Sequence, residues 1–225
     1  SKASEVQNGM CFQSRPTVRD HAGTFFWKSK DIKMTSLDIH FLHGFGMVGQ
    51  HSENITMDDV DFEAPKESGR TTAGYADFVQ MSGCKGTINI SNCTFAGPHD
   101  DPINIHGTFN TVTAISSDRR TITVQYNHNE TAGFPNFFEG DEIEFMTKGN
   151  MITVEDSVRT VTKVDGPDGM GGNMGDGSGS LTTIKLTLNE AVPSDVQVNQ
   201  HVVENITYTP TVSYTHLTLL TILRV

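Results

Sequence analysis

Apolar residues recur at fixed positions in three stretches of this sequence. The stretches Ile32–Ile39, Ile55–Phe62 and Ile88–Phe95 each carry an apolar residue at their first, third, sixth and eighth positions. The second stretch begins 23 residues after the first, and the third begins 33 residues after the second. Such alternation predicts short strands, because successive side chains of a strand point to opposite faces. A repeat of this length without a helical period is typical of a solenoid.

The repeat therefore predicts an all-β fold, a parallel β-helix in which each copy forms one coil. Neighbouring coils would lie about 4.8 Å apart, the spacing of hydrogen-bonded strands. The polar segment Glu63–Thr72 accounts for the longer second gap and predicts an edge loop. Asn54, just before the second copy, predicts a turn that enters the strand. Cys93 takes the position that Leu37 and Val60 fill in the other copies, which favours core packing over chemistry.

Residues 108–200 show a different pattern, in which short strands alternate apolar and polar residues between turn signals. The expected strands are Phe109–Ile115, Thr121–Tyr126, Glu142–Met146, Val158–Val164 and Leu181–Leu188. This pattern favours an inserted small antiparallel β-barrel or sandwich. The glycine-rich stretch within it, Asp165–Ser180, lacks the ligand spacing of a calcium loop and does not lead from a strand into a helix. We interpret it as a linker.

The sequence Glu-Asn-Ile-Thr occurs at Glu53–Thr56 and again at Glu204–Thr207. Its return predicts that residues 201–212 resume the β-helix. The last stretch, Ser213–Val225, has no Asn or Gly turn and is dominated by Leu and Thr. It resembles translated sequencing-adapter read-through, so we expect a non-native tail that forms no further coil. The expected organisation is β-helix coils over 1–107, the insertion over 108–200, a return over 201–212 and the tail over 213–225.

Charge and metal-ligand spacing narrow the classes of partner. The net charge is -11, with 27 acidic against 16 basic residues, so a nucleic-acid phosphate backbone would be repelled. The sequence contains no run of about 18 apolar residues, so it predicts no membrane span. His40 and His43 lack a third ligand nearby, and the cysteines do not have zinc spacing. We expect no metal or other cofactor, and the sequence makes no prediction of oligomeric state.

The candidate chemistry lies in the segment 76–107, which holds Asp77, Asp100 and Asp101. Asp77 and Asp100 are 23 residues apart, the spacing of the first two copies, so the carboxylates should meet on adjacent coils. Crowded carboxylates raise one another's pKa, so one can keep its proton while another stays charged. Glycosidic bond cleavage needs such an acid and such a base, about 6.5–9.5 Å apart for inversion or about 5–5.5 Å for retention. The spacing alone leaves the stereochemistry open.

The residues around the aspartate pair suggest a sugar-binding surface. Adjacent strand residues point to opposite faces, but Pro102 and the preceding Gly97–Pro98 predict a bend that presents both aspartates on one side. Asn104 and His106 share one face of the next strand, opposite the apolar residues between them. Together with His99, they are the predicted substrate-binding residues. The alternative is a surface of a non-catalytic glycan-binding solenoid.

Five motifs strongly resemble glycoside hydrolase family 110: LHGFGMVGQHSENIT, GYADFVQMSGCKG, HDDPINIHG, GDEIEF and VVENITYTP. The resemblance covers residues 23–212. It implies a secreted bacterial exo-α-galactosidase that releases terminal α-1,3-linked galactose, as on blood group B glycans, with inversion. It also implies a right-handed parallel β-helix interrupted by small β-barrels. Family members are much longer than 225 residues.

By this resemblance Asp77, Asp100 and Asp101 form the catalytic trio. Similarity to β-helical polygalacturonases would make Asp100 the acid, with the other two aspartates holding the water, and an exchange of Asp100 with Asp101 stays open. A polygalacturonase itself would need a basic cleft for its anionic substrate, and no Lys or Arg lies between Lys85 and Arg119. The expected partner is therefore a terminal α-galactosyl glycan, and the expected location is secreted, periplasmic or cell-surface.

Overall fold

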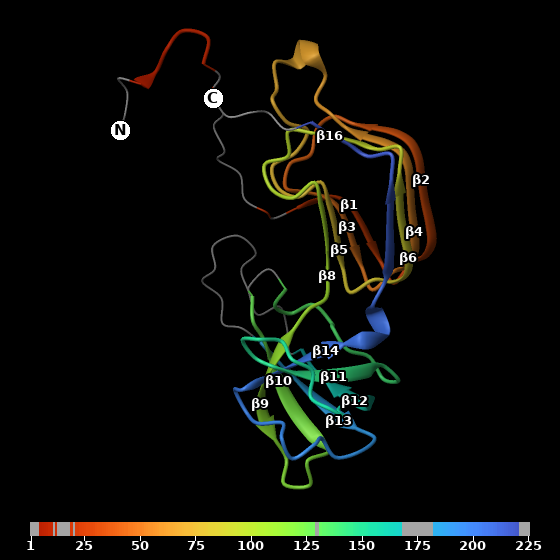
Figure 1. The fold of residues 1–225 in the computed structure, drawn as a ribbon, viewed down its shortest axis with the longest axis vertical. Coiled ribbons are helices and arrows are strands. Elements are labelled where there is room, and N and C mark those ends of the chain that lie inside the picture. The colour runs from red at the N-terminus through yellow and green to blue at the C-terminus, as the bar shows by residue number, and fades with distance from the viewer. Residues whose placement is uncertain are drawn as a thin grey trace.

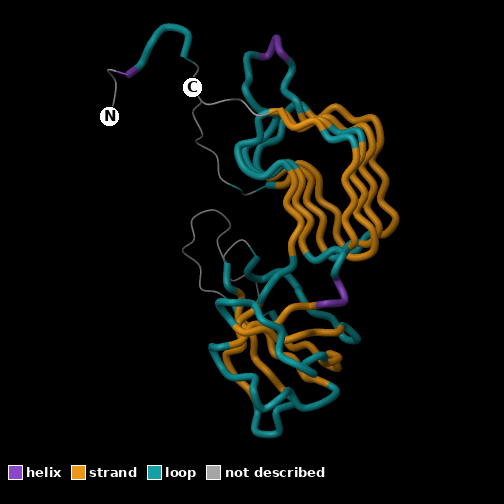
Figure 2. Tube along the Cα trace, viewed as in Figure 1, coloured by secondary structure: helices purple, strands orange, loops and turns teal. Residues whose placement is uncertain are grey.

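The chain folds as an all-β protein with two parts, a stack of parallel strands and a closed antiparallel barrel. The computed structural model describes residues 5–10, 12, 19, 21–128, 131–167 and 182–220. In Figure 1 the stack occupies the upper part of the molecule and the barrel the lower part. Figure 2 shows that strands and loops make up almost all of the described chain. None of the described helices has the length and apolar character needed to cross a membrane.

One parallel sheet, called sheet B, contains the three repeats found in the sequence. Its strands from these repeats are β2 (Lys30–Ile39), β4 (Glu53–Phe62), β6 (Lys85–Ser91) and β7 (Thr94–Ala96). Ile32 lies opposite Ile55, and Ile55 lies opposite Ile88. The alignment predicted from the apolar positions is therefore confirmed as the register of the sheet. After β4, the segment predicted to be an edge loop contains the short helix η2 (Lys66–Ser68).

The second parallel sheet, called sheet A, carries the candidate site. Its strands, in spatial order, are β1 (Ala22–Trp27), β3 (Phe45–Gln50), β5 (Val79–Ser82) and β8 (Ile103–His106). Sheets A and B bury their inner faces in one apolar core. Phe62 stacks in it between Phe78, at a ring distance of 5.2 Å, and Phe95, at 5.3 Å. Cys93 is 1% exposed in the same core, as predicted.

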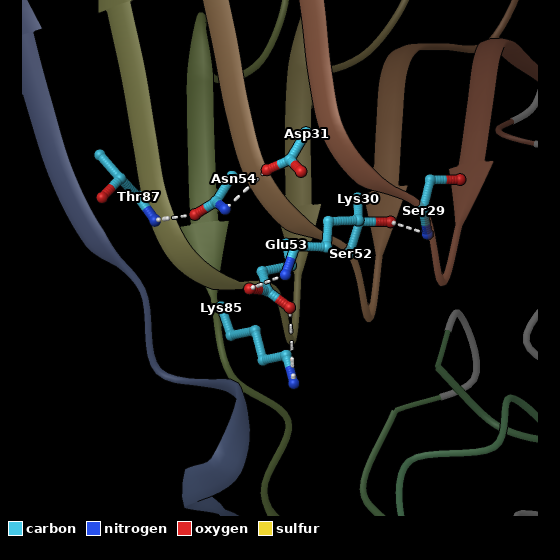
Figure 3. A network of polar contacts seen from close by, with 8 residues as sticks. All are labelled: Ser29, Lys30, Asp31, Ser52, Glu53, Asn54, Lys85 and Thr87. Atoms are coloured by element: carbon cyan, nitrogen blue, oxygen red, sulfur yellow. Dashed lines mark hydrogen bonds and ion pairs between the residues drawn. The ribbon is translucent and has the colours of Figure 1, made fainter.

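A ladder of polar contacts fixes one corner of the stack (Figure 3). Asp31 and Asn54 both have left-handed backbones, with φ of 55° and 56°. Asn54 Nδ2 donates to Asp31 Oδ1 at 2.8 Å, and the Thr87 amide donates to Asn54 Oδ1 at 3.2 Å. Asn adopts this conformation more readily than most residues, and here its side chain bridges the two neighbouring strands. Beside the ladder, Glu53 pairs with a lysine on each neighbouring strand.

The inserted region forms a closed six-stranded barrel, one of the two architectures that the pattern predicted. Its strands are β9 (Asn110–Ile115), β10 (Thr121–Tyr126), β11 (Glu142–Thr147), β12 (Arg159–Asp165), β13 (Thr183–Leu188) and β14 (His201–Asn205). All of its strand pairs are antiparallel. Most of the glycine-rich stretch lies outside the described residues. Inward-facing aliphatic and aromatic side chains fill the barrel.

The prediction that residues 201–212 resume the β-helix is wrong for the first part of that range. Strand β14 pairs antiparallel with β11 and β9 and closes the barrel. Its Val202 and Val203 are buried, so this strand serves the barrel core. The Glu-Asn-Ile-Thr motif at 204–207 instead runs from the end of β14 into the short helix η3 (Ile206–Tyr208).

The prediction that no coil forms after Val212 is also wrong. Strand β15 (Thr211–Thr215) pairs in parallel with β6, and β16 (Thr218–Leu220) pairs with β7. The reason is that the stretch keeps the repeat pattern: Val212 and Tyr214 lie opposite Ile88 and Ile90. Leu217 packs against the core of the stack. The origin of this stretch stays a prediction, and residues 221–225 lie outside the described part.

Aromatic and cationic side chains join the barrel to the stack. The His51 ring lies edge-on to Phe138 at 5.2 Å and to Tyr208 at 4.8 Å. Lys28 Nζ lies 3.2 Å from the centre of the Phe138 ring, a cation–π contact. Burial, followed by the positive charge of Lys28, lowers the pKa of His51 to about 4. The junction therefore holds a neutral histidine between two aromatic rings at neutral pH.

Candidate functional site

Asp77 lies in the segment that leads into β5 and is held on both sides by neighbouring segments of the stack. On one side the Gly46 amide donates to the Asp77 carbonyl at 2.8 Å. On the other side the Phe78 amide donates to the Asp101 carbonyl at 3.1 Å. Hydrogen-bonded strands are about 4.8 Å apart, so the backbones of Asp77 and Asp101 are neighbours. Asp77 is level with Asp101, whereas the repeat spacing had aligned it with Asp100.

The Asp77 side chain is buried and accepts a hydrogen bond from Asn104. It is 4% exposed, and Asn104 Nδ2 donates to its Oδ2 at 3.0 Å. Burial raises the pKa of Asp77, and the charges of Asp100 and Asp101 act in the same direction. The hydrogen bond from Asn104 and the charge of Arg19 lower the pKa and offset part of this effect. Asp77 is therefore the carboxyl group of the three best suited to hold a proton.

Asp100 and Asp101 occupy the bend before β8, and both are exposed. Their backbone joins the stack directly afterwards, where the Val79 amide donates to the Pro102 carbonyl at 3.2 Å. Asp100 Oδ2 forms an ion pair with the guanidinium of Arg19. The bend thus places two exposed carboxylates beside the buried carboxyl of Asp77.

Of the predicted substrate-binding residues, Asn104 is brought to the aspartates. Asn104 faces away from the core, whereas Ile103 and Ile105 pack against the core, as their alternation predicted. His106 has other partners: its Nδ1 donates to the Gly107 carbonyl at 2.8 Å, and its Nε2 lies 3.4 Å from Gln80 Nε2. His99 lies just before the pair and is half-buried.

The sequence pattern did not predict Arg19 as a site residue, because Arg19 lies in a stretch without periodicity, 81 residues before Asp100. Its guanidinium carbon also lies 5.5 Å from the centre of the Phe45 ring, at the start of β3. Phe45 is buried and packs with Val48 and Ala76. A basic residue from before β1 thus reaches a bend in the stretch between Lys85 and Arg119, which carries no Lys or Arg of its own.

The arrangement provides a buried acid next to exposed bases. A carboxyl group with a raised pKa can donate a proton to a leaving oxygen, and a charged neighbour can activate water. Across the described residues there is no group of three or more His, Cys, Asp or Glu side chains that could hold a metal ion.

Comparisons with known proteins find the same type of enzyme repeatedly. Residues 121–167 match the family model described as GLAA-B beta-barrel domain II. An alpha-1,3-galactosidase A of Streptomyces avermitilis is 48% identical over 210 residues, which are 93% of this chain and 33% of the relative. An alpha-1,3-galactosidase A of Bacteroides thetaiotaomicron is 40% identical over 91% of this chain and 34% of the relative.

A differently named relative shares part of the chain. An alpha-1,3-galactosidase B of Bacteroides thetaiotaomicron is 34% identical over 62% of this chain and 23% of its own length. The chain spans about a third of the length of the more similar relatives.

Proposed function

We propose that this chain, which resembles the alpha-1,3-galactosidases and the motifs of glycoside hydrolase family 110, contributes the catalytic centre of an enzyme releasing terminal α-1,3-linked galactose from glycans. The substrate and activity are those that the names of the relatives give. They are proposed for a protein of the relatives' full length that contains this chain. Its partner would be a terminal α-galactosyl glycan, and its location secreted, periplasmic or cell-surface.

The observation that carries the proposal is the contrast between the buried Asp77 and the exposed pair beside it. Asp77 has a raised pKa, caused first by burial, whereas Asp100 and Asp101 face solvent. Glycosidic cleavage needs one carboxyl group that gives a proton and one that activates water. The three aspartates can divide these roles without a metal ion, with Asn104 holding the Asp77 carboxyl in place.

We further propose inversion and a β-helical scaffold. Inverting enzymes keep about 6.5–9.5 Å between the two carboxyl groups, which leaves room for a water molecule. The parallel register of sheets A and B, shared core and repeated corners support coils of a right-handed parallel β-helix. In such a fold the aspartates would occupy successive coils, which holds them at fixed separations.

The test compares single Asp-to-Asn variants at 77, 100 and 101 on two substrates. With Galα1-3Gal, whose leaving group needs a proton, each change should lower kcat by about 10²- to 10⁴-fold. With α-galactosyl fluoride, whose leaving group needs none, only the variant lacking the acid should keep its turnover. The exposed Asp38 on β2 supplies the matched control, Asp38→Asn. Full activity of all three variants would refute the proposed site.

The same experiment assigns the roles. The raised pKa of Asp77 favours the variant at 77 as the one that keeps turnover of the fluoride. The analogy with polygalacturonases favours the variant at 100. Loss of both activities in every variant would contradict a separate acid among the three.

A further inference from the structure

Arg19 connects three parts of the candidate site that lie far apart in sequence. Its guanidinium forms an ion pair with Asp100 Oδ2 in the bend before β8. The same group lies over the ring of Phe45, 5.5 Å from its centre. Its charge also acts on Asp77, before β5. A single side chain thus contacts, or acts on, residues at or just before the starts of three neighbouring strands of sheet A.

An arginine suits this position for two physical reasons. Its planar guanidinium can bind a carboxylate with its edge while its face lies on an aromatic ring. Three neighbouring carboxyl groups also repel one another when ionised, and a fixed cation reduces that repulsion. Within the described residues, Arg19 is the cation whose charge acts on Asp77, against the charges of Asp100 and Asp101.

We propose that Arg19 is a positioning residue that holds the Asp100 carboxylate in a fixed orientation and sets the charge balance of the three aspartates. The proposal rests on the proposed function of those aspartates. Phe45 is buried, so its ring provides a rigid support for the guanidinium. The Arg19 side chain is 32% exposed, so replacing it should leave the core of the stack intact.

Two effects follow from removing the cation. The Asp100 carboxylate loses its partner and can turn away from the productive orientation, and a misplacement of this kind costs up to about a hundredfold in rate. The pKa of Asp77 also rises, because a charge that lowers it has been removed. Any limb of the pH–rate profile that depends on an ionised aspartate of the three should therefore move to higher pH.

The experiment uses the full-length protein with Arg19→Gln and Arg19→Lys. Arg19→Gln should lower kcat by about tenfold to a hundredfold while KM changes little, and should shift the acidic limb upward. Arg19→Lys keeps the charge without the planar group, so the limb should stay in place while kcat falls. The control is Arg70→Gln. The guanidinium carbon of Arg70 lies 4.6 Å from the centre of the Phe41 ring, a comparable cation–π contact outside the site. An unchanged kcat and limb in Arg19→Gln would overturn the proposal.

A second measurement does not depend on activity. The carboxyl carbon of Asp77 can be followed by NMR during a pH titration of the labelled chain, with Asp77→Asn identifying the signal. Its midpoint should rise in Arg19→Gln and stay in place in Arg70→Gln. An unmoved midpoint in Arg19→Gln refutes the charge effect. If the Asp-to-Asn variants stay fully active while the midpoint moves, the proposed function fails and the charge effect stands.

Discussion

Protonation of His51 should weaken the attachment of the barrel to the stack. This side chain is 8% exposed and lies between Phe138 and Tyr208. Burial first, and the charge of Lys28 second, lower its pKa from 6.5 to about 4, against a hydrogen bond with Pro135. In the unfolded chain the usual pKa returns, so the unfolded state binds the proton more readily. The stability gained from the neutral ring is complete above about pH 6.5 and is lost as the pH falls towards about 4.

The size of the effect follows from the difference between the two pKa values. His51 should cost about 3 kcal/mol of unfolding free energy between about pH 7 and about pH 4. The assay is urea unfolding across this range for the unchanged chain and for His51→Leu, which cannot titrate. As the pH falls, the unchanged chain should lose about 3 kcal/mol of unfolding free energy relative to His51→Leu.

Comparing two proteins isolates this one group. Burial raises the pKa of Asp77, Asp141 and Glu204, and these carboxyl groups affect both proteins equally. His40→Leu, at an exposed histidine, is the matched control for replacing a histidine by leucine. Parallel stability curves for His51→Leu and the unchanged chain would refute the account of the junction.

Two further predictions concern the stack. Asn54→Ala should destabilise the chain by about 2 kcal/mol, because it removes the hydrogen bonds to Asp31 and Thr87 and strains a left-handed backbone. Asn54→Gly should cost less in the same denaturation assay, and an equal cost would rule out backbone strain. Phe62→Ala should cost about 3–5 kcal/mol, because it leaves a cavity beside Phe78, whereas Phe62→Leu should cost clearly less. Calorimetric melting would contradict this packing if the two changes had equal effects.

The register of sheet B could be predicted because burial acts on every copy of the repeat in the same way. Ile32, Ile55 and Ile88 face one core, so their shared position in the sequence became a shared position in space. The burial of Cys93 in the core was predicted by the same reasoning. The barrel strands were found because they alternate as strands with one buried face do.

The wrong predictions rest on short sequence patterns, whereas longer structural elements determine where these residues lie. Four residues at 204–207 repeat an earlier motif, but closing the barrel required the strand formed by residues 201–205. In the last stretch, the composition rich in Leu and Thr hides the positions of Val212, Tyr214 and Leu217, which continue the repeat. The alignment of Asp77 with Asp101, rather than with Asp100, depends on the length of the loop between the strands, which periodicity does not specify.

Part of the candidate site could be predicted for the same physical reason. Asn104 lies on β8, whose Ile103 and Ile105 point into the core, so its outward orientation followed from alternation. Arg19 could not be found in this way, because an ion pair between residues 81 positions apart leaves no local pattern. Only the position of Arg19 in the folded chain shows this ion pair.

The most direct test of the central claim follows the anomeric proton of the sugar released from Galα1-3Gal by a full-length protein containing this chain. If the three aspartates cleave the bond by a single displacement with water, the first product is β-galactose, which later converts to the equilibrium mixture. Initial α-galactose would contradict inversion, and the absence of any galactose would contradict the proposed substrate.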